Sequence, residues 1–221
     1  MSKNNNVKLN VYNPKIKSNI KCVILGDSGI GKTSIIKQFH HKNFDKFNET
    51  TLGAIFWEIN FNYKSNCKVK INFWDTAGQE RYNSLIPMYV RDCDIVILAF
   101  DLTNKYTLEN LKKWYQFVVN NYCNPTVIVV GNKEDLKVFH TIDQKTIDKF
   151  IESEFKNKPK FIRTSAKKNI NISELFEYIF SVSSSIIEDR IKYEKNTISN
   201  NIQIDSDPND NLKNYKCCNI L

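Results

Sequence analysis

Five short apolar segments, rich in β-branched residues, recur along the chain between polar stretches. Segments of this length and composition favour buried β-strands. They span residues 20–25, 69–74, 94–100, 126–130 and 160–163. Helical patterns follow four of them, one opening at Thr33 and the others covering about 107–122, 143–155 and 172–188. Alternating strands and helices predict an α/β fold with a mostly parallel sheet covered on both faces.

The chain has 221 residues, of which 41% are hydrophobic, so we expect one domain with tails. Residues 1–17 are polar and asparagine-rich, which predicts a disordered extension before a domain at 18–189. From Arg190 the composition shifts toward Asn, Ser and Asp, typical of a flexible tail over 190–221. We expect neither a membrane span nor a signal peptide, and therefore no disulfide framework from the six cysteines.

The net charge of +8 does not by itself indicate nucleic-acid binding. The lysines are dispersed, and no stretch interleaves aromatic and basic residues as nucleic-acid motifs do. We therefore expect no nucleic-acid partner.

A phosphate-binding loop follows the first predicted strand. Backbone N–H groups freed by glycine, together with a helix N-terminus, can surround phosphate oxygens. Lys32 would reach the β- and γ-phosphates, and the Thr33 hydroxyl would bind Mg²⁺. The alternative is a glycine turn that binds nothing. The lysine and the threonine at the last two positions of the motif argue against it. The loop reads Gly26-Asp27-Ser28-Gly29-Ile30-Gly31-Lys32-Thr33, with Ser34 next.

A second motif indicates which base is bound. Asn132-Lys133-Glu134-Asp135 follows the predicted strand at 126–130, about 100 residues after the phosphate loop. A carboxylate at Asp135 can accept two N–H groups from guanine, and adenine offers no such pair. Four residues alone could be an ordinary loop, but the distance from the phosphate loop favours guanine.

A third motif, Asp75-Thr76-Ala77-Gly78-Gln79-Glu80, follows the strand at 69–74. Asp75 can hold the Mg²⁺ shell, Gly78 can bring its N–H to a γ-phosphate, and Gln79 can orient a water for in-line attack. The alternative is a simple turn.

With these motifs the chain resembles a Ras-superfamily small GTPase and, within it, a Rab, over about residues 18–185. The resemblance implies a six-stranded P-loop GTPase domain with helices on both faces. It implies that the backbone of Ser165-Ala166-Lys167 contacts the guanine O6 and that Thr51 meets Mg²⁺ and the γ-phosphate. Thr50 is a rival, but Thr51-Leu52-Gly53 fits the family pattern. Phe44 would pack on guanine, or equally be a core residue.

Local segments resemble Rabs as well. Residues 52–56, 70–80 and 100–103 match Rab segments, and 81–89 are similar to the second switch of the early-endosomal branch. Tyr89-Val90-Arg91-Asp92-Cys93 and Ile55 depart from the family pattern, which leaves effector identity open. Three aromatic residues match the triad that Rabs present to effectors, although ordinary core packing explains them equally well: Phe56, Trp74 and Tyr89.

The chain ends Cys217-Cys218-Asn219-Ile220-Leu221, which fits a prenylation box whose terminal leucine favours geranylgeranyl. Asn219 departs from the usual aliphatic residue, and an unmodified cysteine pair is the alternative. Residues 190–221 hold five basic and four acidic side chains, so there is no polybasic patch. One lipid gives only reversible membrane binding. We therefore expect geranylgeranyl on both Cys217 and Cys218.

Together these features predict a monomeric, membrane-anchored GTP/GDP switch in endocytic vesicle traffic. Lys32, Thr51 and Gln79 would carry hydrolysis, and Thr33, Thr51 and Asp75 would hold Mg²⁺. The resemblance implies an exchange factor, an activating protein, a GDP-dissociation inhibitor or escort protein, and trafficking effectors. It places the protein on the cytoplasmic face of an endosomal membrane, cycling with cytosol. The alternatives are a P-loop ATPase or kinase, a binding-only pseudo-GTPase scaffold, and a Ras- or Rho-like signalling GTPase at the plasma membrane.

Overall fold

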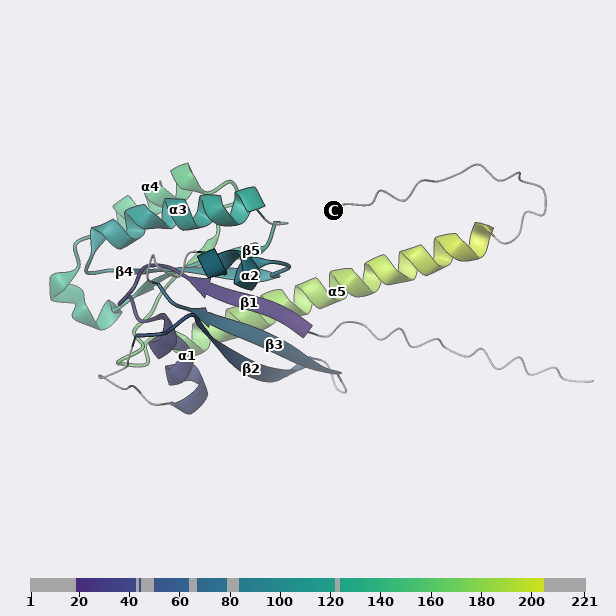
Figure 1. The fold of residues 1–221 in the computed structure, drawn as a ribbon, viewed down its shortest axis with the longest axis horizontal. Helices are drawn as coiled ribbons and strands as arrows, with labels where there is room; N and C mark the ends of the chain where they lie inside the picture. Colours follow the sequence, from purple (N-terminus) through teal and green to yellow (C-terminus); the bar gives the residue numbers. More distant parts are fainter. Residues whose placement is uncertain are drawn as a thin grey trace, which may run out of the picture. The chain divides into compact units, whose positions relative to one another are not determined.

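Among the residues that the structure describes, six strands form one sheet in the order β2-β3-β1-β4-β5-β6 (Figure 1). This computed structural model describes residues 19–42, 44, 50–63, 67–78, 84–121 and 124–204. Only the β2–β3 pair is antiparallel, which confirms the predicted mostly parallel α/β sheet. The strands are β1 (Asn19–Leu25), β2 (Ala54–Tyr63), β3 (Cys67–Thr76), β4 (Ile95–Asp101), β5 (Thr126–Asn132) and β6 (Lys160–Arg163).

Helices cover both faces of the sheet, as predicted (Figure 1). α3 (Lys105–Asn121) and α4 (Gln144–Glu154) lie on one face, and α1 (Lys32–His41) and the part of α5 (Ile172–Ile204) up to Ile186 lie on the other. The described part of the chain also contains two short helices, α2 (Ile86–Val90) and the 3₁₀-helix η2 (Glu134–Phe139).

The alternation of side chains along β1 explains the two layers, because successive residues of a strand point to opposite faces. Val23 and Leu25 are fully buried in an apolar cluster with Leu108 and Leu111 of α3. On the opposite face, Phe176 of α5 stacks on Phe39 of α1, with ring centroids 3.7 Å apart. Two apolar layers therefore fix the sheet between its helices.

The predicted elements lie within a few residues of the observed ones, but the pattern indicated neither β2 nor the two short helices α2 and η2, and α5 is longer than expected. β2, an edge strand, was not expected from the apolar pattern, because Ile59 and Tyr63 are the only side chains in it that are buried. α5 continues to Ile204, whereas the pattern predicted a helix ending near Glu188 and a flexible tail from Arg190. No glycine or proline interrupts residues 189–204, so the two residues that oppose a helix most strongly are absent there.

The chain divides into two units inside α5, one spanning Lys17–Ile186 and the other containing Ile187–Ile204. The sheet and every site residue discussed below belong to the first unit. In the second, the Thr197 hydroxyl donates to the Tyr193 carbonyl at 2.9 Å, within the helix. The limits of the predicted domain and tails, 1–17, 18–189 and 190–221, stay predictions. Within the described part of the chain, the helices lack the combined length and apolar character needed to cross a bilayer.

The parallel strands bring their carboxyl ends to one edge of the sheet. The segments after β1, β3, β4, β5 and β6 therefore converge there, and they carry the three sequence motifs and residues 165–167. Ligands of open α/β sheets bind at this edge.

Candidate nucleotide-binding site

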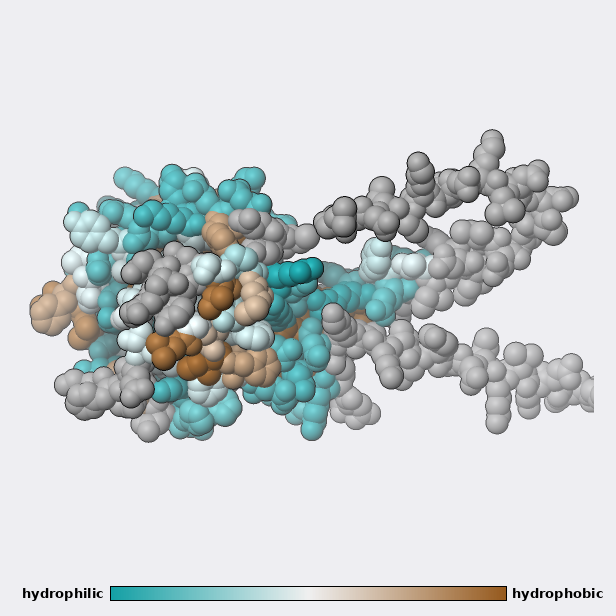
Figure 2. All heavy atoms as spheres, viewed as in Figure 1, coloured by the Kyte–Doolittle hydropathy of each residue, from teal (hydrophilic) through white to brown (hydrophobic). Residues whose placement is uncertain are grey.

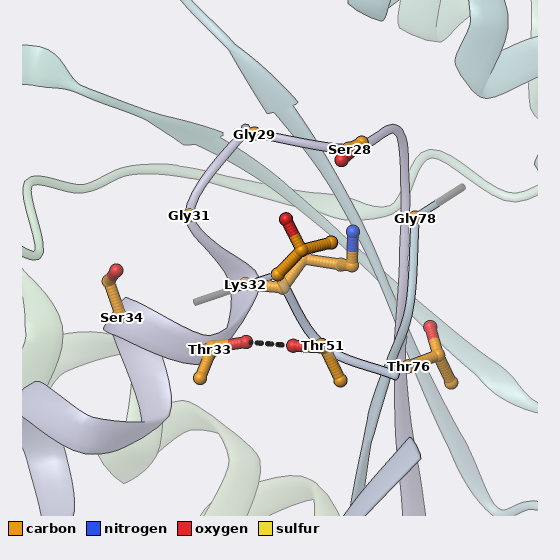
Figure 3. Close-up of a pocket in the computed structure, with 10 residues that line it drawn as sticks. Ser28, Gly29, Gly31, Lys32, Thr33, Ser34, Thr51, Thr76 and Gly78 are labelled. Carbon is orange, nitrogen blue, oxygen red and sulfur yellow. Dashed lines mark hydrogen bonds between the residues drawn. The ribbon is translucent and has the colours of Figure 1, made fainter. Parts of the chain in front are cut away.

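Two adjoining cavities lie at the carboxyl edge of the sheet. The first measures about 210 Å³ and is lined by the phosphate loop and the segments around Thr51 and Gly78 (Figure 3). The second measures about 440 Å³ and is lined by the same loop, the loop after β5 and residues 166–167. Gly29, Gly31 and Ser34 border both cavities. One elongated ligand can therefore occupy the two together.

The backbone of the phosphate loop is left-handed where it enters α1. Gly31 has a φ of 94° and precedes the helix without any side-chain cap. The first N–H groups of an α-helix have no partner within the helix, so this end of α1 can donate to an anion, which the helix dipole also attracts. A Cβ at Gly31 would run into the Asn132 amide, so this position requires glycine for space as well as for conformation.

Lys32 extends into the first cavity while it is 5% exposed (Figure 3). Its ammonium donates to the carbonyls of Gly26 at 2.7 Å and Asp27 at 2.8 Å. Burial lowers the pKa of Lys32 to about 8, although Asp75 and Asp27 oppose the shift. Among the described residues no carboxylate forms an ion pair with Lys32, and a buried cation of this kind favours a ligand that carries negative charge.

The predicted metal ligands come together beside Lys32. The hydroxyl oxygens of Thr33 and Thr51 are 2.9 Å apart (Figure 3). Asp75 is fully buried, and neither of its carboxylate oxygens has a hydrogen-bond partner of good geometry. Burial raises the pKa of Asp75 to about 6, against the Thr33 hydroxyl, Lys32 and Lys37, which lower it.

This donor set fits Mg²⁺. Mg²⁺ prefers oxygen ligands and is usually bound by one or two carboxylates together with substrate phosphates. Among the described residues no group of three His, Cys, Asp or Glu side chains could hold a metal. The Asp75 carboxylate, together with the hydroxyls of Thr33 and Thr51, therefore matches the way this ion is bound beside phosphates. Thr50 also lines the cavity, but the contact with Thr33 belongs to Thr51.

Gly78 lies directly against the phosphate loop. A Cβ there would overlap the Asp27 carbonyl and the Lys32 ammonium, so only glycine permits this approach. The N–H of the preceding Ala77 donates to the Gly53 carbonyl at 2.7 Å, which ties the segment after β3 to the segment before β2. Gln79 and Glu80 lie outside the described residues.

The second cavity collects the residues predicted to read the base: Phe44, Asn132, Lys133, Asp135, Ala166 and Lys167. Phe44 is half-buried at the wall of this cavity and does not belong to the fully buried core. Asp135 accepts a hydrogen bond from the Ser165 hydroxyl at 2.5 Å. Ser165 thus steadies Asp135 without lining the cavity itself.

Asn132 connects the two cavities. Its amide nitrogen donates to the Ile30 carbonyl at 2.8 Å. Its amide oxygen accepts from the Thr164 hydroxyl at 3.2 Å and from the Ala166 N–H at 3.3 Å. One side chain, 2% exposed, therefore holds the phosphate loop and the 164–166 loop at a fixed spacing.

Several supporting residues escaped the sequence analysis because their contacts join distant segments. Asp101, at the end of β4, pairs with the Lys133 ammonium at 2.6 Å. The Asp27 carboxylate accepts from the Asn110 amide at 2.7 Å and from the Trp114 indole at 3.1 Å, both on α3. Two signals were available for Asp101: it is a polar residue that ends an apolar strand, and it lies in the 100–103 segment that resembles Rabs. Nothing in the sequence indicated the partners of Asp27.

The three aromatic residues predicted as an effector surface form one cluster. Trp74 lies 5.3 Å from Phe56 and 5.5 Å from Tyr89 between ring centroids. Phe56 is 48% exposed, whereas Tyr89 is buried, so the cluster is partly core and partly surface. Figure 2 shows apolar residues gathered over α2 and the neighbouring strands. Leu52, Ile55 and Met88 add further exposed apolar side chains.

Comparisons with known proteins agree with this geometry. The Ras family model matches residues 21–184. The Ras-related protein Rab-5B of Plasmodium falciparum is 37% identical over 73% of this chain and 76% of its own length. The GTP-binding protein ypt5 of Schizosaccharomyces pombe is 33% identical over 84% and 87%. The Ras-related protein RABF2a of Arabidopsis thaliana is 38% identical over 72% and 78%.

The bridging role of Asn132 predicts a large loss of stability on its removal. Asn132→Ala leaves the Ile30 carbonyl and the Ala166 N–H buried without this partner. We expect the free energy of unfolding to fall by about 2–4 kcal/mol, measured by urea denaturation at matched nucleotide concentration. Asn60→Ala is the control, because Asn60 bonds Glu58 on the surface at 3.2 Å. Equal losses from the two variants would contradict the bridging role.

Proposed function

This chain belongs to the Ras family of GTP-hydrolysing small GTPases, within its Rab branch, and we propose that it is a membrane-anchored GTP/GDP switch regulating vesicle traffic at endosomes. The observation that carries the proposal is the pair of adjoining cavities. One presents a buried cation and metal-binding oxygens, and the other presents a carboxylate held by Ser165. A purine nucleotide carrying several phosphates and Mg²⁺ is complementary to both.

Guanine selectivity is assigned to Asp135. Its carboxylate has acceptor positions beyond the one that Ser165 occupies, and guanine offers the N1–H and 2-amino donors to fill them. Adenine lacks this pair of donors and would leave the carboxylate unpaired, which gives strong rejection. Lys133, tied to Asp101, and Phe44 would flank the base, while the backbone of 165–167 would contact its O6.

Phosphate binding is assigned to Lys32 and the N–H groups of the phosphate loop. Thr33, Thr51 and Asp75 would hold Mg²⁺, which when bound neutralises charge on the phosphate oxygens. Lys32 keeps its ammonium beside Gly78, where a γ-phosphate would lie. Gln79 would orient the attacking water. Without an arginine in these motifs, hydrolysis is expected to be slow until a partner supplies one, worth roughly 10³ to 10⁵ in rate.

Switching follows from the link between the two segments that flank the first cavity. Thr51 precedes β2 and Gly78 follows β3, and the Ala77–Gly53 hydrogen bond joins them. A γ-phosphate contacted by both would order them together, and its loss would release both. Phe56 lies on β2 just after Thr51, and Trp74 lies on β3 just before Gly78, and with Tyr89 they form the aromatic cluster. Effectors bound to this cluster would therefore sense the bound nucleotide.

Membrane attachment is assigned to Cys217 and Cys218, which lie outside the described residues. Two lipids give stable attachment where one does not. Similarity to Rab-5B, ypt5 and RABF2a, together with the resemblance of residues 81–89, supports the early-endosomal branch. An exchange factor, an activating protein, a GDP-dissociation inhibitor or escort protein and effectors would drive a monomer between cytosol and the cytoplasmic face of that membrane.

Base selectivity should be altered by one substitution. Asp135→Asn replaces an acceptor with an amide donor, which matches the C2 carbonyl of xanthine instead of the 2-amino group of guanine. We expect the affinity for GDP to fall by roughly 10²-fold or more and that for XDP to rise, measured by displacement of a fluorescent nucleotide. Asp148→Asn, exposed on α4, should change neither affinity. Retained preference for GDP in Asp135→Asn would contradict the assignment of the base site.

Hydrolysis should depend on Gln79. Gln79→Leu removes the group that would orient the water, so GTP should persist and stimulation by an activating protein, roughly 10³-fold or more, should be lost. Single-turnover hydrolysis, with and without that protein, measures this. Gln116→Leu, exposed on α3, should behave as the wild type. Wild-type rates in Gln79→Leu would refute the role.

Both terminal cysteines should be lipidated. Intact-mass analysis of protein from its native cell should show two geranylgeranyl groups, and Cys217→Ser or Cys218→Ser should each carry one and partition less to membranes. A single lipid on the wild-type chain would disprove this part of the proposal.

A further inference from the structure

The base-reading loop adopts backbone conformations that need support. Lys133 has a φ of 69°, in the left-handed region that residues with a side chain rarely occupy. Leu136 breaks the regular geometry of the short helix η2, with φ −96° and ψ 42°. Asp135 lies between Lys133 and Leu136, so the direction of its carboxylate depends on both. Such conformations persist only where surrounding contacts hold them.

Those contacts centre on Glu134, the variable residue of the Asn-Lys-x-Asp motif. Its carboxylate accepts a hydrogen bond from the Arg163 guanidinium at 3.1 Å, and the two side chains are 14% and 24% exposed. His140 lies 4.0 Å from the same carboxylate oxygen, and its Nε2 is 3.3 Å from the Lys133 carbonyl. The loop is therefore held from its side chain and from its backbone, on the side away from the cavity.

Arg163 is itself fixed to the rest of the fold. It lies at the end of β6, where its Nε donates to the Gln144 side chain at 3.0 Å and its carbonyl accepts from the Asn171 amide at 2.9 Å. The backbone of Glu134 is tied to the same place, because its N–H donates to the Thr164 carbonyl at 3.0 Å. Glu134 thus makes two bonds to consecutive residues, and Ser165, the partner of Asp135, comes next.

We propose that Glu134, Arg163 and His140 are positioning residues that aim the Asp135 carboxylate and so set how strongly the site selects guanine. The inference rests on the proposed function, since it concerns the same base site. None of the three side chains lines the second cavity, so each would act through Asp135 and not on the nucleotide. A partly buried ion pair with a defined geometry suits this role, because breaking it leaves one charge without its partner.

The 2-amino group of guanine provides a readout that general loosening of the fold would not move. IDP carries hypoxanthine, which keeps the N1–H and O6 of guanine and lacks only that amino group. The ratio of GDP to IDP affinity therefore reports how well Asp135 meets the 2-amino donor, because the phosphate contacts are common to both nucleotides. A variant that merely weakens the fold lowers both affinities and leaves the ratio unchanged.

The test compares Glu134→Gln, Arg163→Met and His140→Ala with the wild type, by displacement of a fluorescent nucleotide with GDP and IDP in the presence of Mg²⁺. We expect the ratio to fall about tenfold in Glu134→Gln and Arg163→Met, as for one misaligned hydrogen bond to a charged group. A smaller fall is expected in His140→Ala. Lys137→Ala is the matched control, because the Lys137 side chain is 74% exposed and lies 3.6 Å from Glu134, so its loss should leave the ratio unchanged.

A charge exchange keeps the test decisive if the single variants fold poorly. Glu134→Arg combined with Arg163→Glu restores the ion pair with its charges reversed. The double variant should recover part of the lost preference for GDP over IDP, whereas neither substitution alone should do so. Wild-type ratios in Glu134→Gln and Arg163→Met would overturn the inference while leaving the proposed function intact. Failure of the wild type itself to prefer GDP to IDP and to ATP would instead overturn the proposed function.

Discussion

The buried Asn132 side chain is the contact on which both halves of the nucleotide site depend. It joins the Ile30 carbonyl of the phosphate loop to the Thr164 hydroxyl and the Ala166 N–H on the far side of the base cavity. The sheet makes this possible, since parallel strands β1, β5 and β6 end at one edge and deliver all three segments there. The protein thereby sets the spacing between the first cavity, assigned to the phosphates, and the second cavity, assigned to the base, before any ligand binds. This reduces the ordering needed on binding.

Lys32 and Asp75, two groups of opposite charge, are both buried beside the first cavity. The same desolvation lowers the pKa of Lys32 to about 8 and raises that of Asp75 to about 6. Burial thus destabilises each charged form, and a phosphate beside the lysine and a cation beside the carboxylate would each offset that cost. Burying these two groups lowers the stability of the protein without ligand, and a metal–phosphate pair that neutralises both charges would restore it. This arrangement suits a switch, because removing one phosphoryl group changes the balance of charge at Lys32 and at the segments around Thr51 and Gly78.

The sequence predicted those parts of the site whose chemistry is carried by neighbouring residues. The phosphate loop and the Asn-Lys-x-Asp motif each place their functional groups within a few positions, so spacing alone reveals them. The supports of these motifs were not predictable. Asp27 is held by Asn110 and Trp114 of α3, and Glu134 is held by Arg163 of β6, and only the folded chain brings these pairs together. The apolar pattern missed β2, whose edge position leaves most of its side chains outside the core. It ended α5 too early because the polar composition after Arg190 outweighed three isoleucines at helical spacing, Ile191, Ile198 and Ile202.

The central claim, that this edge of the sheet binds guanine nucleotide with Mg²⁺, is tested most directly by the nucleotide that the purified protein carries. Protein is denatured, the released nucleotide is identified by chromatography, and the refilled site is competed with GTP, GDP and ATP in the presence of Mg²⁺. We predict that GDP or GTP is released and that ATP does not compete. An empty site, or one that ATP fills, would contradict the assignment of Asp135 to guanine and with it the switch.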